Sequence, residues 1–369
     1  MFAGIEIAGP PAGLSPPSAE GPNFRVAIAG KLTLPSPLIA YDLPWHRCPP
    51  TTCQAIAEQL DRRGIAVAGL RSELQWSAAP EQGLDRSGSR LAICPYRPDR
   101  FGLQIEDLLG AQIIDIRLHA IFDQHGLPLF DASLLRRWDQ RSAQIADRAE
   151  ELYGGMRSVA WPPDVASWEK IGGKVSQLRS LAPQAAIAIS IDARRFPQAL
   201  APLADTSADL IGISAEQWPL EETEVLVQLI AEAIDHFAVD PSRSRPSLFV
   251  VPPAGLTVVD CLKLLALGVK LVAIDGWCRG LLEPTKQTAP TPAQWAATAL
   301  GVSTEVFGEK EVEIDLRQLD RALEEFQLWG AFLGIGAVEN LNRDFLVSYR
   351  PGIPGIKSLA APRGASRDR

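Results

Sequence analysis

Cysteine and histidine are scarce in this chain of 369 residues, which has five cysteines and four histidines. The odd cysteine count, and the lack of a basic segment followed by an apolar one near the N-terminus, argue against a secreted, disulfide-bonded protein. We therefore expect a cytoplasmic protein with reduced thiols. Cys48 and Cys53 lie close together in CPPTTC, but no second Cys/His pair follows at the spacing of a zinc site, so no metal is expected there.

The chain also lacks a run of basic residues and a long apolar segment. Its 36 Lys and Arg are outnumbered by 44 Asp and Glu, which gives a formal net charge of −8 and no basic field to attract a polyphosphate. No stretch of ~20 uninterrupted apolar residues is present that could span a bilayer. We expect neither a nucleic-acid partner nor a membrane partner, and a protein partner or a homo-oligomer stays open.

What the chain does have is a series of short apolar runs, rich in β-branched residues, that alternate with helical patterns. Such runs indicate strands covered on both faces, and the helices between them indicate parallel crossover connections. Eight βα units in a chain of this length predict an α/β fold, the (β/α)8 TIM barrel. An open doubly wound sheet is the alternative, because strand order is not visible in a sequence. The expected strands are residues 32–41, 64–70, 113–118, 157–162, 185–192, 210–214, 247–252 and 271–276.

Both ends of the chain differ in composition from this central part. Residues 1–23 and 350–369 are rich in proline, glycine and serine, and we expect a flexible N-terminal segment and a flexible tail. Residues 24–349 then form the barrel domain. This domain includes an extra C-terminal helix at 314–335, which follows the eighth unit and is expected to pack against the barrel wall.

Polar side chains lie at or just beyond the ends of several expected strands, where TIM barrels carry their active sites. The candidates are Arg117, His119, Asp192, Glu216 and Asp275. In one interpretation they form a cluster of ligands or general acids and bases, since carboxylates brought together in a cleft perturb one another's pKa values. In the other they are ordinary polar residues at strand ends and helix starts. The sequence does not decide between the two.

Several segments, in the same order along the chain, resemble one enzyme family. They are Phe101-Gly102-Leu103 with the stretch up to Arg117, PPDVASWEKI at 162–171, APQAAIAIS at 182–190, DCLKLLALGVKLVAI at 260–274 and LDRALEEFQLWGAFLGIGAVENL at 319–341. Together these segments resemble the FMN-binding synthase domain of glutamate synthase and the glutamate synthase-like proteins. The similarity runs from about Leu32 to Leu346.

This resemblance implies a flavin barrel. It implies that FMN binds with its phosphate on the loops after strands seven and eight and its ring over the barrel mouth. It also implies a neighbouring iron-sulfur cluster and reductive amination of 2-oxoglutarate, the activity of an oxidoreductase acting on CH–NH2 donors.

The residues at these positions depart from the family pattern. Pro253-Ala254-Gly255 stands where the family has a Gly-Gly phosphate loop, and proline has no backbone N–H to donate. Asp275-Gly276 replaces a Gly-Thr pair, and a carboxylate beside a phosphate repels it by roughly 1 kcal/mol per charge pair in water and several-fold more at an effective dielectric constant near 20. Ser190 replaces a lysine, and Cys278 alone follows strand eight where a cluster needs three or four cysteines.

Two functions follow from this combination. The sequence favours a divergent barrel that has lost FMN and the iron-sulfur cluster and acts as a non-catalytic structural or regulatory subunit, with no cofactor. The alternative is an FMN-dependent amino-acid oxidoreductase of glutamate synthase type. A third possibility is a barrel that uses its polar residues as a hydrolase or lyase, but no motif supports it.

Overall fold

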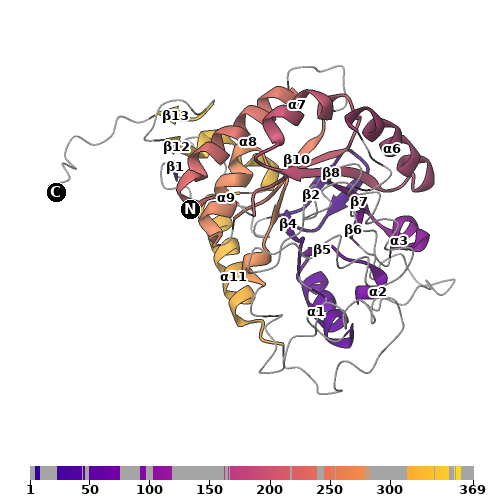
Figure 1. The fold of residues 1–369 in the computed structure, drawn as a ribbon. Coiled ribbons are helices and arrows are strands. Elements are labelled where there is room, and N and C mark those ends of the chain that lie inside the picture. The colour runs from indigo at the N-terminus through magenta and orange to yellow at the C-terminus, as the bar shows by residue number, and fades with distance from the viewer. Residues whose placement is uncertain are drawn as a thin grey trace.

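Eight parallel strands form a barrel surrounded by helices in the computed structural model of the protein (Figure 1). The structure describes residues 5–8, 23–43, 45, 50–74, 92–96, 103–118, 162, 165, 167–216, 218–238, 245–253, 255–278, 281, 314–335, 337–348, 353 and 355–358. The barrel strands are β4 (Leu38–Ala40), β5 (Ala66–Val67), β6 (Ile93–Tyr96), β7 (Ile113–Leu118), β8 (Ala186–Asp192), β9 (Leu210–Ser214), β10 (Ser247–Val251) and β11 (Leu271–Ala273).

The strands follow one another around the barrel in chain order. Their spatial order is β5-β4-β11-β10-β9-β8-β7-β6, and every neighbouring pair is parallel. A parallel bridge between Ala68 and Ile93 joins the two ends of this order. The predicted TIM barrel is therefore confirmed, because an open doubly wound sheet reverses its strand order and stays open.

The barrel contains one strand that the sequence did not predict. The third barrel strand is β6. It was not predicted because it has only four residues and contains Pro95, and proline is rare inside strands. The expected strand at 157–162 lies, except for its last residue, outside the described residues. Strand β7 pairs directly with β8 along its whole length, so no strand lies between these two in the barrel.

The segment expected as the first strand, 32–41, is divided by two prolines. Its first part, β3 (Leu32–Leu34), forms an antiparallel hairpin with β2 (Val26–Ile28) before β4 begins the barrel. Three hairpin side chains, Val26, Ile28 and Leu34, pack among the residues that begin the barrel strands. Beside them, Lys31 Nζ donates to Asp209 Oδ1 at 3.0 Å. The hairpin therefore covers the amino-terminal end of the barrel and leaves the other end, the mouth, for a ligand.

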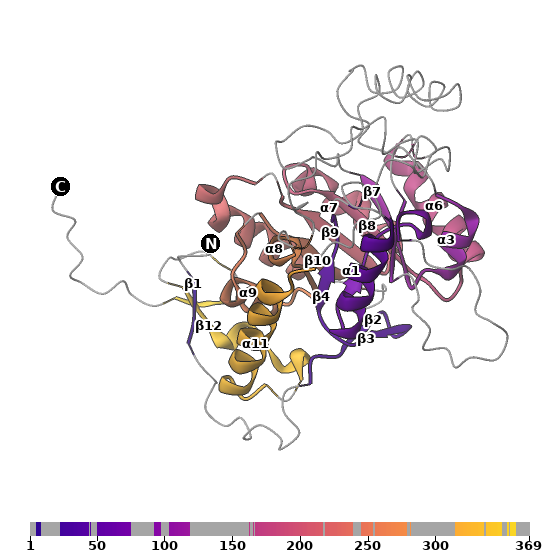
Figure 2. The same ribbon diagram turned by 90° about the horizontal axis from the view of Figure 1, so that it is seen from below.

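A ring of helices covers the outside of the barrel. Strands β4 to β11 are followed, in turn, by α1 (Pro50–Arg62), α2 (Arg71–Leu74), α3 (Ile105–Gly110), α6 (Trp168–Leu181), α7 (Phe196–Ala204), α8 (Thr223–Ala238), α9 (Val258–Leu267) and α11 (Arg317–Phe332). The expected C-terminal helix is α11, which lies between α9 and α1 (Figures 1 and 2). Arg63 Nε donates to Asp320 Oδ1 at 2.7 Å and so links the end of α1 to α11.

Helix α9 is buried on all sides, which explains why its residues are apolar almost throughout. It begins at a capping box in which Thr257 Oγ1 accepts the N–H of Asp260, and it ends at Gly268, whose φ of 114° is the left-handed conformation that glycine adopts readily. The side of α9 away from the barrel contacts α11 and β1 (Ile5–Ile7).

Strand β1 belongs to a small sheet that lies outside the barrel. It pairs with β12 (Leu346–Ser348), which also pairs with β13 (Lys357–Ser358). Two short pieces of the chain ends, expected from composition to be flexible, thus form strands. The described residues also include the short 3-10 helices η2 (Leu220–Glu222), η3 (Asp275–Trp277), η5 (Val338–Asn340) and η6 (Arg343–Phe345).

Candidate functional site

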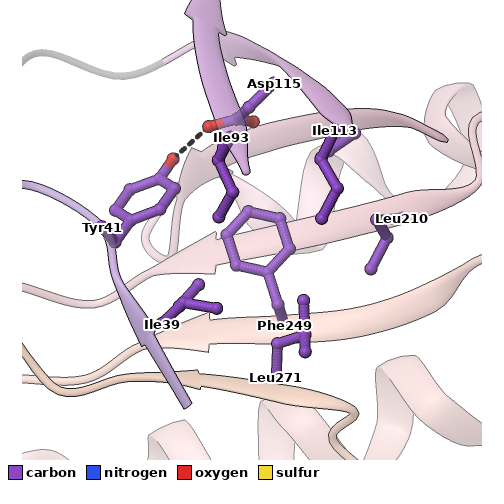
Figure 3. Close-up of a pocket in the computed structure, with 9 residues that line it drawn as sticks. Ile39, Tyr41, Ile93, Ile113, Asp115, Leu210, Phe249 and Leu271 are labelled. Atoms are coloured by element: carbon purple, nitrogen blue, oxygen red, sulfur yellow. Dashed lines mark hydrogen bonds between the residues drawn. The ribbon is translucent and has the colours of Figure 1, made fainter. Parts of the chain in front are cut away.

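Among the residues that the structure describes, the inside of the barrel is a packed core. It contains a cavity of about 10 Å³, which is room for about one water molecule. Figure 3 shows the ring of Phe249 between Ile39 and Leu210, where it fills the centre. The cavity is lined by Ile39, Tyr41, Ile93, Ile113, Asp115, Ala188, Leu210, Phe249 and Leu271. This core therefore forms the floor of the barrel mouth.

A hydrogen-bonded network of polar side chains lies at the upper end of the core. The hydroxyl of Tyr41 donates to Asp115 Oδ2 at 2.6 Å (Figure 3) and lies 2.8 Å from Ser190 Oγ. Burial raises the pKa of Tyr41 well above its usual value, so this hydroxyl stays a proton donor. Period-two alternation brings Asp115, Arg117 and Ser190 to the inner face of their strands.

Arg117 joins this network to the mouth. Its guanidinium donates to Asp115 Oδ2 at 3.1 Å, to Asp42 Oδ1 at 2.7 Å and to the carbonyl of Tyr41 at 2.8 Å. It also lies 4.0 Å from the centre of the Tyr41 ring. Burial by itself lowers the pKa of a guanidinium, but the oxygens of Tyr41, Asp42 and Asp115 outweigh it and raise the pKa of Arg117. Arg117 is thus a permanent buried cation.

Asp275 connects the loop after β11 to the loop after β4. Its Oδ1 accepts the backbone N–H of Tyr41 at 2.7 Å, and its Oδ2 accepts that of Asp42 at 3.1 Å. Removal from water, together with the negative charge of Asp42, raises the pKa of Asp275 to about 7, although these hydrogen bonds and Arg117 act in the opposite direction. An aspartate at the expected phosphate loop therefore has a structural use, and its carboxyl group is partly protonated near neutral pH.

The loops after β10 and β11 meet at two glycines. A Cβ atom added to Gly276 would lie 3.9 Å from the backbone nitrogen of Gly255, and a Cβ atom added to Gly255 would meet nothing within 4 Å. Gly255 has a φ of 89°, which strains any other L-residue. Trp277 Nε1 donates to the carbonyl of Leu256 at 2.8 Å and holds the two loops together. The junction therefore presents bare backbone, as a phosphate site requires.

The remaining candidates from the sequence lie apart from these features or beyond the description. Asp192 Oδ1 accepts the N–H of Arg194 at 2.8 Å in the turn after β8. Glu216 is half-buried in the turn after β9, and Pro253 is buried after β10. His119 and Ala254 lie outside the described residues. Of the candidates, the structure brings Arg117, Ser190 and Asp275 together through Tyr41 and Asp42.

Tyr41 and Asp42 were missed by the sequence analysis, although they directly follow the first barrel strand. The rule that places functional groups after barrel strands would have included them, had the strand's end been located at Ala40.

The described residues show no metal site and no membrane-spanning helix. Within them, no group of three or more His, Cys, Asp or Glu side chains is placed to hold a metal ion. Cys278 is buried, and burial together with Asp275 raises the pKa of its thiol. No helix in this part of the chain is long and apolar enough to cross a bilayer.

Comparison with known proteins gives similarity at the level of the fold. No protein-family model matches the chain, and no curated protein matches it by sequence. Among solved structures, the flavin-binding domain of baker's yeast flavocytochrome b2 matches with a TM-score of 0.52 at 12% identity, covering 98% of this chain and 79% of that one. An active chimera of (S)-mandelate dehydrogenase matches with a TM-score of 0.51 at 14% identity, covering 94% and 88%. A mutant flavocytochrome b2 with pyruvate bound reaches 0.53 at 12% identity, covering 98% and 80%.

The expectation that no cofactor binds is contradicted by these comparisons, because one of the matching proteins is described as a flavin-binding domain and shares the fold along 98% of this chain. That expectation rested in part on repulsion between the carboxylate of Asp275 and a phosphate. This repulsion is weaker than the sequence implied. The carboxyl group of Asp275 is hydrogen-bonded to the loop after β4, and its raised pKa reduces its negative charge.

Proposed function

We propose that this protein is an FMN-dependent oxidoreductase whose flavin phosphate binds where the loops after β10 and β11 meet. The observation that carries the proposal is the close, bare approach of Gly255 and Gly276 in a barrel of this fold. Phosphate sites in TIM barrels lie on the loops after the seventh and eighth strands, and β10 and β11 hold those positions here.

The residues present at this junction fit a phosphate. Gly255 and Gly276 have backbone N–H groups and no side chain to keep an anion away, and helix α9 begins directly after the first of these loops. The first-turn N–H groups of Val258 and Val259 have no partner within the helix, and the positive end of the helix dipole favours an anion. Pro253 contributes no donor, so binding depends on the glycines and the helix.

Below the mouth, the buried network forms a hydrogen-bonded floor. When bound, FMN would supply the electron acceptor for oxidation of a substrate. Asp42 has 13% of its side chain exposed at this end of the barrel, and Arg117, only 1% exposed, fixes its position. Asp42 is therefore the carboxylate of this network that a ligand at the mouth can contact, and it can accept a hydrogen bond from a substrate hydroxyl or amino group.

The substrate class is a finer hypothesis. The resemblance of the sequence to glutamate synthase favours an amino or imino acid as the substrate, with chemistry at a CH–NH2 group. The names of the proteins similar in fold include (S)-mandelate dehydrogenase, which favours a 2-hydroxy acid instead. We retain the amino-acid oxidoreductase as the hypothesis, because the segments that resemble glutamate synthase occur in the same order as in that family and extend along most of the chain.

The proposal is tested with purified protein incubated in excess FMN and then desalted. We expect a visible flavin absorbance at about one FMN per chain, and anaerobic addition of L-glutamate is expected to bleach it. Bleaching by (S)-mandelate but not by L-glutamate would reject the amino-acid hypothesis and keep the oxidoreductase. A protein that retains no flavin would reject the proposed function altogether.

A further inference from the structure

Asp275 is the acidic residue next to the proposed phosphate site. It directly precedes Gly276 in the chain, and its carboxyl group lies against the N–H groups of Tyr41 and Asp42. Among the described residues, two charged side chains act on its pKa, and one neutral thiol lies nearby. Asp42 comes from the loop after β4 and Arg117 from β7, while Cys278 belongs to its own turn and is neutral. One cation thus faces a carboxylate pair, and Arg117 is also bonded to Asp115.

This balance of charge leaves Asp275 poised to gain or lose a proton. Its carboxyl group is partly removed from water, and the nearby negative charge of Asp42 further favours its neutral form. A phosphate placed beside Gly276 would add up to two more negative charges close to the same group. Since binding of an anion favours protonation of a neighbouring acid, protonation must equally favour binding of the anion.

We infer that Asp275 takes up a proton when FMN binds, so that the affinity for FMN falls as the pH rises above neutrality. The inference rests on the proposed function and extends it with a regulatory property of the same site. It also gives the aspartate a role that glycine would lack: its carboxyl group ties the loop to the chain after β4, and the site accepts a phosphate best when this group is neutral.

The inference is tested by measuring dissociation constants for FMN and for riboflavin, which lacks the phosphate, over a range of pH. For the wild-type protein, uptake of one proton predicts that the dissociation constant for FMN rises by up to about tenfold per pH unit between about pH 7 and 8.5. The constant for riboflavin should change little over this range. Calorimetry in buffers of different ionisation enthalpy should show uptake of up to about one proton per FMN bound near neutral pH.

Two variants separate Asp275 from other titrating groups, including the phosphate of FMN. Asp275→Asn keeps an oxygen that accepts one backbone N–H but does not titrate, so its FMN affinity should be nearly independent of pH above neutrality. Asp192→Asn is the matched control, because Asp192 also ends a barrel strand but caps its own turn, and this variant should behave as the wild type does.

Each outcome has a separate meaning. FMN binding that is strong but independent of pH in the wild type, or equally pH-dependent in Asp275→Asn, would overturn the inference and leave the proposed function intact. Equal pH dependence for FMN and riboflavin would also overturn it, since the phosphate would then not be responsible. Failure of the wild type to bind either flavin at any pH would overturn both the inference and the proposed function.

Discussion

The carboxyl group of Asp275 accepts the backbone N–H of Tyr41 at 2.7 Å, although the two residues are 234 positions apart in the chain. This bond joins the end of the last barrel strand to the end of the first. It therefore fixes the two loops at the point where the barrel closes on itself. Because Tyr41 is also bonded to Asp115, the same bond connects the mouth to the polar network in the core.

Replacing Asp275 by alanine should destabilise the protein. The N–H groups of Tyr41 and Asp42 would lose their acceptor, and an unsatisfied buried donor costs about 1–3 kcal/mol. We expect a decrease of about 2 kcal/mol in the free energy of unfolding, measured in urea at about pH 5, where the carboxyl group of the folded wild type is neutral and its contribution to stability is still present. Asp275→Asn, which retains one acceptor oxygen, should lose less. Equal stability of Asp275→Ala and wild type would show that these bonds contribute nothing.

The raised pKa of Asp275 also predicts how stability depends on pH. A carboxyl group with a pKa of about 7 in the folded state and 3.8 in the unfolded state binds its proton more tightly when folded. Its contribution to stability is therefore greatest at low pH and is lost as the pH rises towards 7. Allowing for partial solvation, we expect the wild type to lose about 1–2 kcal/mol relative to Asp275→Asn between about pH 5 and 8.

This pH prediction is checked by urea unfolding of both proteins at several pH values. Other groups titrate equally in the two proteins, so the difference between their curves isolates Asp275. A difference that is constant across the range would contradict the raised pKa.

Much of the fold could be predicted from sequence, for reasons visible in particular segments. The sequence predicts buried parallel strands at residues 210–214 and 247–251, because their apolar side chains can face both the core and the surrounding helices. Strand β6 could not be predicted, since four residues with a proline carry no periodic signal. The strand at 271–273 was predicted from its apolar run, and the helix before it is bounded by Thr257 and Gly268, the residue types that such helix ends favour.

The site was predictable only in part. The position of Asp275 beside the phosphate loop follows from counting strands, but its partners do not. Tyr41 and Asp42 are brought to it by closure of the barrel, a long-range contact that no local pattern records. Without those partners, the sequence indicated only a charge that repels phosphate. The structure shows a hydrogen-bonded group whose charge depends on pH.

Replacing Arg117 by methionine should destabilise the protein strongly. The variant would leave the carboxylates of Asp42 and Asp115 without their shared cation, and breaking a buried ion pair by removing one partner costs about 3–5 kcal/mol. Tyr41→Phe serves as a milder comparison, because it removes one hydroxyl and leaves the ion pairs, and should cost about 1–2 kcal/mol. A smaller effect for Arg117→Met than for Tyr41→Phe would contradict the central role of the guanidinium.

Packing at the centre of the barrel gives a further prediction. A Cβ atom added to Gly212 would overlap the ring of Phe249, so Gly212→Ala should destabilise the protein by about 1–3 kcal/mol or more. Phe249→Leu removes the obstructing ring and, although destabilising alone, should reduce the cost of Gly212→Ala. The test is a double-mutant cycle from thermal or urea unfolding. Strictly additive effects would mean that the two residues are not in contact.

Titration of FMN into wild type and Gly276→Val at pH 6 tests whether the junction of Gly255 and Gly276 holds the phosphate of FMN. The Cβ atom of this valine would make ordinary van der Waals contact with the Gly255 nitrogen at 3.9 Å, and its two methyl groups would fill the place of the phosphate. We expect about one FMN per chain for the wild type and binding at least about tenfold weaker for the variant, a loss of about 1.4 kcal/mol. Equal affinities in two equally folded proteins would contradict this expectation.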